Sequence, residues 1–66
     1  MAVTKVIELI GKSTESWEDA ARSALAAAGK SLHGITGIQV MDWSAKVVDS
    51  EIVEYRADVK ISFTVD

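Results

Sequence analysis

The clearest alternation of apolar and polar positions lies in residues 51–65. Even positions there are mostly polar, and odd positions are mostly apolar, the exceptions being the first two residues. The apolar set comprises Val53, Tyr55, Ala57, Val59, Ile61, Phe63 and Val65. A period of two is typical of a β-strand with one buried face. The pattern therefore predicts a long strand whose apolar face is covered by the one helix that the chain provides.

Residues 3–10 predict a strand of a different kind, because apolar side chains occur on both of its faces. Ile7 and Leu9 follow Val3 on one face, and Val6 and Ile10 lie on the other. Two apolar faces are typical of a strand that is buried on both sides. One side can meet the helix, so we expect the other side to meet a second subunit.

The helix is predicted from residue 16 to about residue 32. Its apolar residues recur at steps of three and four, at Trp17, Ala21, Ala24, Leu25, Ala28 and Leu32. Either Ser13 or Ser16 is a candidate N-cap, and acidic residues follow in the first turn, where the helix dipole favours them. Gly34 is expected to end the helix. Gly29, inside the helix, is interpreted as a point of close backbone approach.

Residues 35–48 predict a second strand, which a turn at Asp49-Ser50 joins to the last strand as a hairpin. Ile38 and Val40 are expected on one face, and the other face should carry Met41, Trp43, Ala45 and Val47. Placing the last strand between the other two makes the whole sheet antiparallel. The prediction is one α+β domain over residues 1–66, a β-α-β-β protomer with a three-stranded antiparallel sheet wrapped around one helix.

Composition adds the expectation of self-association. A chain of 66 residues hides only about 60% of the surface that its unfolded form exposes. Because 48% of the residues are hydrophobic, contact between copies is the expected outlet for the remaining apolar surface. The absence of cysteine excludes disulfides and thiolate metal sites. A net charge of −3 without a basic block argues against a nucleic-acid partner.

Targeting and catalytic signals do not emerge from the sequence. Lys5 and Glu8 interrupt the first apolar run, which is unlike a signal peptide, and no apolar run is long enough to span a membrane. We therefore expect a cytoplasmic protein without a membrane partner. Neither a nucleophile–base pair nor a phosphate loop nor zinc-ligand spacing is present, and His33 stands alone. The expectation is a binding protein and not an enzyme.

Three segments resemble the dodecin family, and the resemblance covers essentially the whole chain. They are residues 5–11 with Ser13, residues 16–21, and residues 54–56 followed by 59–63. The resemblance implies a protomer whose sheet curls around the helix. It also implies a hollow homododecamer of cubic 23 symmetry that binds flavin, as riboflavin or FMN, near its threefold axes. The implied function is storage and sequestration of that ligand.

This chain departs from the family pattern at its ligand-determining positions. Where flavin-binding dodecins stack a tryptophan, near the start of the second strand, this chain carries Gly37, and Gln39 follows in the same segment. Arg56 replaces the glutamine that holds the polar edge of the ring, and Ser44 replaces an arginine that meets nucleotide phosphate in some members. The candidate ligand-binding residues are Gly37, Gln39, Asp42, Trp43 and Arg56.

Two of these candidates have a structural alternative. Trp43 follows Gly37 by six residues and is expected on the same face of a regular strand. It is either a stacking platform or an interface residue beside Met41, which we favour. Arg56 is either an ion-paired arginine, which we favour, or a fork that recognises a carboxylate, a phosphate or the electron-rich edge of a flavin. For Trp17 we expect packing against the rest of the fold.

Calcium is the alternative ligand. Oxygen ligands suited to Ca²⁺ or Mg²⁺ are available at Asp42, Asp49, Glu51, Glu54 and Asp58. They lack the spacing of an EF-hand loop, so a metal site would have to be assembled across subunits. Some dodecin relatives with a Ser-Trp-Glu helix start are described as calcium-binding. The alternative function is therefore a dodecin-fold shell without flavin that holds calcium or serves only structurally.

Overall fold

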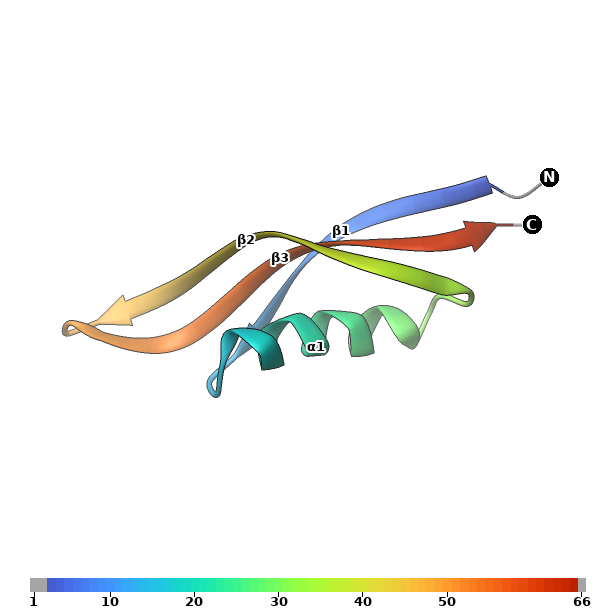
Figure 1. Ribbon diagram of the computed structural model, residues 1–66. Coiled ribbons are helices and arrows are strands. Elements are labelled where there is room, and N and C mark those ends of the chain that lie inside the picture. Colours follow the sequence, from blue (N-terminus) through green and yellow to red (C-terminus); the bar gives the residue numbers. More distant parts are fainter. Residues whose placement is uncertain (1–2, 66) are drawn as a thin grey trace.

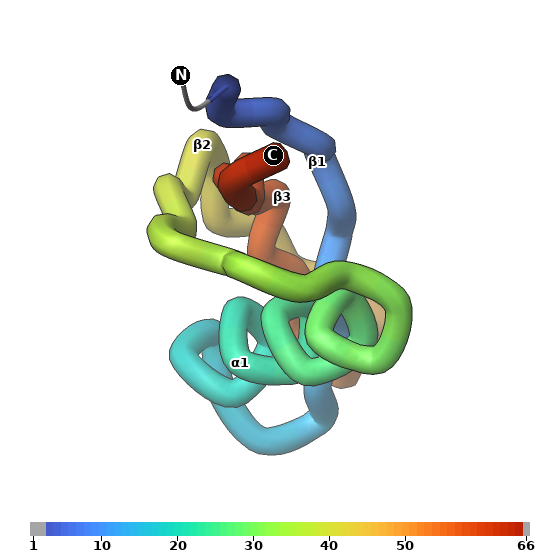
Figure 2. Tube along the Cα trace, turned by 90° about the vertical axis from the view of Figure 1, so that its right-hand side faces the viewer, coloured from blue at the N-terminus to red at the C-terminus, as the bar shows by residue number. Residues whose placement is uncertain are grey.

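A computed structural model describes residues 3–65 as one helix packed on one face of a three-stranded sheet (Figure 1). The elements are β1 (Val3–Ser13), α1 (Trp17–Gly29), β2 (Ile35–Val48) and β3 (Glu51–Val65). The strand order is β1-β3-β2, and both strand pairs are antiparallel. Figure 2 shows the strands in one layer and α1 in a second layer beneath them. The predicted β-α-β-β fold with a central last strand is confirmed.

Both candidate caps take part in the start of α1. Ser16 is the N-cap, and its hydroxyl oxygen accepts a hydrogen bond of 3.0 Å from the backbone N–H of Asp19. The hydroxyl of Ser13 donates to the Asp19 carboxylate at 2.6 Å and accepts from the N–H of Glu15 at 2.9 Å. The turn between β1 and α1 is therefore fixed by side chains as well as by the backbone. No helix within residues 3–65 is long and apolar enough to cross a membrane.

The end of α1 differs from the prediction. The helix ends at Gly29, before Leu32, and the chain passes through a turn to Gly34, whose φ of 72° favours glycine. The Gly34 carbonyl accepts a hydrogen bond of 3.0 Å from Thr64 of β3, which ties this turn to the sheet. Gly34 therefore lies at the end of the loop that connects α1 to β2, and it does not end the helix.

The core is small and consists mainly of alanine methyl groups against the central strand. Its buried members are Ala20, Ala24, Ala28, Ala57, Val59 and Ile61. The inward face of β3 is therefore as predicted at Ala57, Val59 and Ile61, whereas Val53 and Val65, at the two ends of the predicted apolar set, are exposed and not covered by the helix. The predicted helix face is partly wrong, because Trp17 and Leu25 are 37% and 36% exposed and lie at its margin. The stripe that meets the sheet is made of small residues at steps of four, which lets the helix lie close.

Helix and sheet approach each other closely at Gly11 and not at Gly29. A Cβ placed on Gly11 would overlap the carbonyl oxygen of Ala20 and lie 2.9 Å from the Cβ of Ala24. A Cβ placed on Gly29 would meet nothing within 4 Å among the described residues. The interpretation of Gly29 is therefore wrong. Gly11 is buried in β1, and its lack of a side chain sets the distance between the two layers.

Strand β2 does not alternate regularly, so the predicted division of its faces is wrong. Its register with β3 shifts between Val40 and Asp42, where a bulge adds one residue. Beyond the bulge Trp43 lies opposite Ala57 of β3, and side chains of directly paired residues share a face. Trp43 is therefore on the same side of the sheet as Val40, the side that faces α1.

Beyond the helix, β2 and β3 continue as a two-stranded hairpin that projects from the rest of the protomer (Figure 1). We call residues 46–54 the arm, because β1 pairs with β3 only from Tyr55 onward. The turn residues Asp49 and Ser50 have φ values of 53° and 65°, as in a type I′ hairpin turn. Exposed apolar side chains occur on the arm at Val47, Val48, Ile52 and Val53.

Candidate functional site

Four of the five candidate residues lie on the sheet face opposite α1. We call this the helix-free face; it carries the even-numbered residues of β3 from 54 to 64 and the side chains paired with them. Three of its cross-strand rows are Glu8–Lys60–Gln39, Ile10–Asp58–Asp42 and Lys12–Arg56–Ser44. Gly37 lies opposite Ser62 on the same face, whereas Trp43 is on the other face. The expectation that Trp43 and Gly37 share a face is therefore wrong.

A hollow of 490 Å³ surrounds Gly37. It is lined by Val6, Gly37, Ile38, Gln39, Lys60 and Ser62. A Cβ on Gly37 would lie 2.8 Å from the Ser62 hydroxyl, so a larger residue requires that side chain to rotate. The hollow offers an amide, an ammonium and a hydroxyl group, but none of these lining residues is aromatic. A planar ligand would find hydrogen-bond partners here without a stacking partner.

Gly37 and Arg56 are far apart within one protomer. Gly37 pairs with Ser62, and Arg56 lies six residues earlier on β3, which corresponds to about 20 Å along an extended strand. The Arg56 guanidinium pairs with Glu54, which lies still farther along β3 from Gly37, so a flavin ring at Gly37 is out of its reach in this conformation of one chain. A site that uses both requires two protomers.

Arg56 forms an ion pair, as the structural interpretation expects. Its Nη2 atom lies 3.4 Å from Oε2 of Glu54, and Glu54 also lies 3.9 Å from the ammonium group of Lys12. The Nε atom of Arg56 is buried and has no hydrogen-bond partner within residues 3–65. The guanidinium group is thus held in place but is not fully satisfied.

The two tryptophans lie on the side of the sheet that faces α1. Trp17 packs edge-to-face on Tyr55, with 4.8 Å between ring centroids, and its indole N–H donates to the carbonyl of Ser44 at 2.8 Å. It therefore fastens the start of the helix to both β2 and β3. Trp43 is 48% exposed and lines a hollow of 620 Å³ with Trp17. Its candidate role as an interface residue stays a prediction.

The candidate oxygen ligands do not gather into a metal site in one chain. Within residues 3–65 the histidine, aspartate and glutamate side chains form no group of three that could hold an ion. Asp49 and Glu51 lie at the tip of the arm, and Asp42 lies beside Asp58, where its carboxylate accepts from the backbone N–H of Trp43 at 3.0 Å. A metal site would need oxygen atoms from another protomer or from water.

Sequence reasoning missed a contact between two carboxyl groups, Glu8 and Asp58. A side-chain hydrogen bond with Asp58 raises the pKa of Glu8, and the negative charge of Asp58 and desolvation act in the same direction, while Lys60 opposes them. One Asp58 oxygen, Oδ1, is buried without a hydrogen-bond partner in the described part of the chain. Only the register of β1 on β3 reveals this contact, because it places Glu8 one row from Asp58.

The fold is that of a small β-α-β-β protein with one helix on one face of a three-stranded antiparallel sheet and a polar face on the other side. The dodecin family model matches residues 3–66, so the chain belongs to the dodecin family. Calcium dodecin of Mycobacterium tuberculosis is 36% identical over 63 residues, which cover 96% of this chain and 89% of that protein.

Solved structures agree with this assignment. A crystal structure of a Thermus thermophilus dodecin variant superposes with a TM-score of 0.95 at 29% identity and covers 100% of this chain and 98% of that one. The crystal structure of the M. tuberculosis calcium dodecin, described as calcium-chelating, superposes with a TM-score of 0.85 at 34% identity. It covers 97% of this chain and 91% of that chain. The resemblance inferred from the sequence is confirmed at the level of family and fold.

Proposed function

We propose that this dodecin is a homododecameric storage protein that binds without catalysis and sequesters a flavin, with low affinity, between its protomers. The observation that carries the proposal is the hollow at Gly37 on the helix-free face. This hollow lies at the position where the family resemblance implies that the isoalloxazine ring binds. Gln39, Lys60 and Ser62 offer polar groups to the edge of the ring. Enclosure between copies would exclude solvent and limit the photochemistry of the ligand.

Exposed apolar surface supports the oligomeric part of the proposal. Val6 and Ile10 of β1 are 53% and 61% exposed on the helix-free face, and the arm carries four more exposed apolar side chains. A protomer of 66 residues cannot cover them itself. Light scattering should therefore give a mass near twelve protomers. A stable folded monomer of 7.1 kDa would contradict the proposal.

Low affinity follows from what the site lacks. Stacking of a base on an aromatic side chain is worth about 1–3 kcal/mol, so its loss at Gly37 weakens binding by about five- to 150-fold. Arg56 only donates hydrogen bonds and cannot accept from the flavin N–H as a glutamine carbonyl does. Together these two residues predict weaker riboflavin binding than in relatives that carry the tryptophan.

A riboflavin titration of the assembled protein, followed by flavin fluorescence, tests this proposal. Gly37→Trp together with Arg56→Gln should tighten binding more than either change alone, because the two residues contact one ring from different protomers. Gly37→Trp is best made with Ser62→Ala, since the Ser62 hydroxyl occupies the space of the new side chain. Nanomolar binding by the unmodified protein, or no effect of the combined variant, would contradict the placement of the site.

Calcium is a second candidate ligand, and the Glu8–Asp58 contact favours it. These two carboxyl groups lie together, one Asp58 oxygen is buried without a partner, and a relative at 36% identity is named calcium dodecin. Hard oxygen ligands of this kind fit Ca²⁺, and the remaining ligands would come from a neighbouring protomer or water. Calorimetric titration with Ca²⁺ should show binding that Glu8→Gln weakens and that Glu15→Gln, on the distant turn, leaves unchanged. Equal effects of the two substitutions would exclude this site.

A further inference from the structure

A hollow of 620 Å³ lies at the start of α1, on the side of the sheet that faces the helix. We call it the tryptophan hollow, and it is lined by Ser16, Trp17, Glu18 and Trp43. A neighbouring hollow of 200 Å³ shares Glu18 and Trp43 with it and continues along the helix to Leu25. Both tryptophans of the chain therefore border the same space, on the opposite side of the sheet from the hollow at Gly37.

Trp17 is held in place and offers a ligand only apolar surface. Its indole N–H is the one polar group of the side chain, and it already donates to the carbonyl of Ser44 at 2.8 Å. Its ring packs on the ring of Tyr55 with an angle of 75° between the two planes. Part of the ring is nevertheless exposed. A ring that is already immobilised loses little further freedom when a ligand binds against it.

Trp43 contributes the second indole ring, and the bulge in β2 is the reason that it does so. A regular strand would place Trp43 on the helix-free face with Gly37, whereas the register shift after Val40 places it opposite Ala57 of the core. Almost half of Trp43 is exposed there. Exposed apolar surface beside polar residues is typical of a binding surface.

The charge at the tryptophan hollow is negative. Glu18 is the one charged residue among those that line it, and its side chain is 79% exposed. Arg22 lies 3.9 Å from Glu18 one helical turn later, but an exposed ion pair of this kind contributes little, and a ligand can replace it. Glu18 and Asp19 offset the partial positive charge at the start of the helix.

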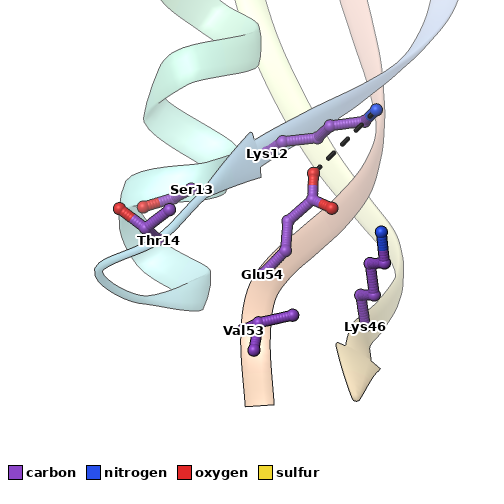
Figure 3. A pocket seen from close by; sticks show the side chains of 6 residues that line it. All are labelled: Lys12, Ser13, Thr14, Lys46, Val53 and Glu54. Atoms are coloured by element: carbon purple, nitrogen blue, oxygen red, sulfur yellow. Dashed lines mark ion pairs between the residues drawn. The ribbon is translucent and has the colours of Figure 1, made fainter. Parts of the chain in front are cut away.

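The lysines of the neighbouring strands lie on the other side of the sheet. Figure 3 shows Lys12 and Lys46 beside Glu54, and the Lys12 ammonium group lies 3.9 Å from a carboxylate oxygen of Glu54. The register pairs Lys12 with Arg56 and Lys46 with Glu54, so these side chains belong to the helix-free face. None of them lines the tryptophan hollow, and the sheet separates them from Glu18.

We propose that the tryptophan hollow binds the alkylated ammonium group of a small organic cation. The faces of indole rings carry negative charge density, which attracts a cation within about 6 Å of the ring centroid. The alkyl groups on the nitrogen bury apolar surface against the rings, and Glu18 supplies the opposite charge. An anion would be repelled by both the rings and the carboxylate. The site uses neither Gly37 nor the helix-free face, so it does not depend on flavin binding.

Proton NMR of choline with the assembled protein tests the proposal. The matched control ligand is dimethylbutanol, the neutral isostere in which carbon replaces the nitrogen. We expect the N-methyl signal of choline to move upfield saturably, because protons above an aromatic ring are shielded, and we expect the isostere to bind about tenfold more weakly. Equal binding of the two ligands would show an apolar groove without preference for a cation and would overturn the proposal. Absence of saturable choline binding would also overturn it.

Substitutions separate the aromatic part of the site from the charged part. Trp43→Leu removes a ring and should weaken choline binding about tenfold, whereas Trp43→Phe keeps a ring and should retain most of the affinity. Glu18→Gln should reduce the preference for choline over dimethylbutanol. Glu15→Gln, in the turn before α1, should change nothing, because Glu15 lines neither hollow. Equal losses in the two Trp43 variants, or equal effects of the two glutamate substitutions, would refute the assignment.

The arm of a second copy is the competing occupant, because it carries exposed apolar side chains of its own. Acrylamide quenching of tryptophan fluorescence in the assembled protein distinguishes the two, and comparison with the Trp43→Phe variant isolates the emission of Trp43. We expect acrylamide to quench Trp43 and choline to reduce that quenching. Emission from Trp43 that is shielded from acrylamide without choline would show that another copy covers the hollow, and it would overturn the proposal.

Discussion

Substitution of Gly11 by alanine probes the distance between α1 and the sheet. The added methyl group would overlap the Ala20 carbonyl oxygen and lie 2.9 Å from the Ala24 Cβ. Carbon atoms in comfortable contact are about 3.5–4.0 Å apart, so the helix must retreat from β1 by about 1 Å or more. Both alanines are buried in the core, and their contacts with β3 would loosen together. Overpacking of this kind costs about 1–3 kcal/mol.

Gly29→Ala makes the same chemical change where space is open. Because a Cβ there meets none of the described residues within 4 Å, the substitution should stabilise the protein, by at most about 0.5 kcal/mol, since Gly29 is the last residue of α1 and the higher helix propensity of alanine counts less there than in a helix interior. Urea unfolding at one fixed protomer concentration measures both effects, since association contributes to stability. Gly11→Ala should lower the urea midpoint and Gly29→Ala should raise it. Shifts in the same direction would refute the assignment of Gly11 as a point of close approach between helix and sheet.

Three further substitutions test other contacts. In the assembled protein, where we expect association to complete the cover over the half-buried Phe63, Phe63→Ala should cost about 3–5 kcal/mol of unfolding free energy. Ser62→Ala should change it by no more than about 0.5 kcal/mol. Comparable urea midpoints for the two variants would show that the faces of β3 are misassigned. Because Asp58 raises the pKa of Glu8 in the folded state, the stabilisation from protonated Glu8 is present below its ordinary pKa and is lost as pH rises through the raised pKa. Glu8→Gln should therefore raise the urea midpoint near neutral pH and lose this advantage in acid; a gain that does not depend on pH would exclude the carboxyl contact as its cause. Trp17→Phe removes an indole N–H that donates to a β2 carbonyl and should cost about 0.5–1.5 kcal/mol in urea unfolding, and an unchanged midpoint would show that this bond contributes nothing.

The fold could be predicted from the sequence because its main signals are local. The alternation in β3 and the serine cap of α1 depend on neighbouring residues, and both are as expected. The bulge after Val40 is different, since an extra residue in one strand is defined only by the pairing with its neighbour. The role of Gly11 was likewise missed, because a contact between a strand and the following helix produces no periodic pattern in the sequence.

The candidate site was less predictable than the fold. The positions of Gly37 and Arg56 follow from the family resemblance, but their separation of about 20 Å follows only from the register. The Glu8–Asp58 contact joins residues fifty positions apart and depends on the same register. Sequence patterns identify which face a side chain occupies, and the pairing of strands decides which side chains meet.

The pairing of Val3 with Val65 has a practical consequence for engineering. Because the first residue of β1 lies directly opposite the last residue of β3, the two ends of the described chain leave the sheet side by side, at the same end of neighbouring strands (Figure 1). A reporter or antigen fused through a flexible linker to either end would therefore emerge from nearly the same point. Two different cargoes, one at each end, would be held next to each other on every copy.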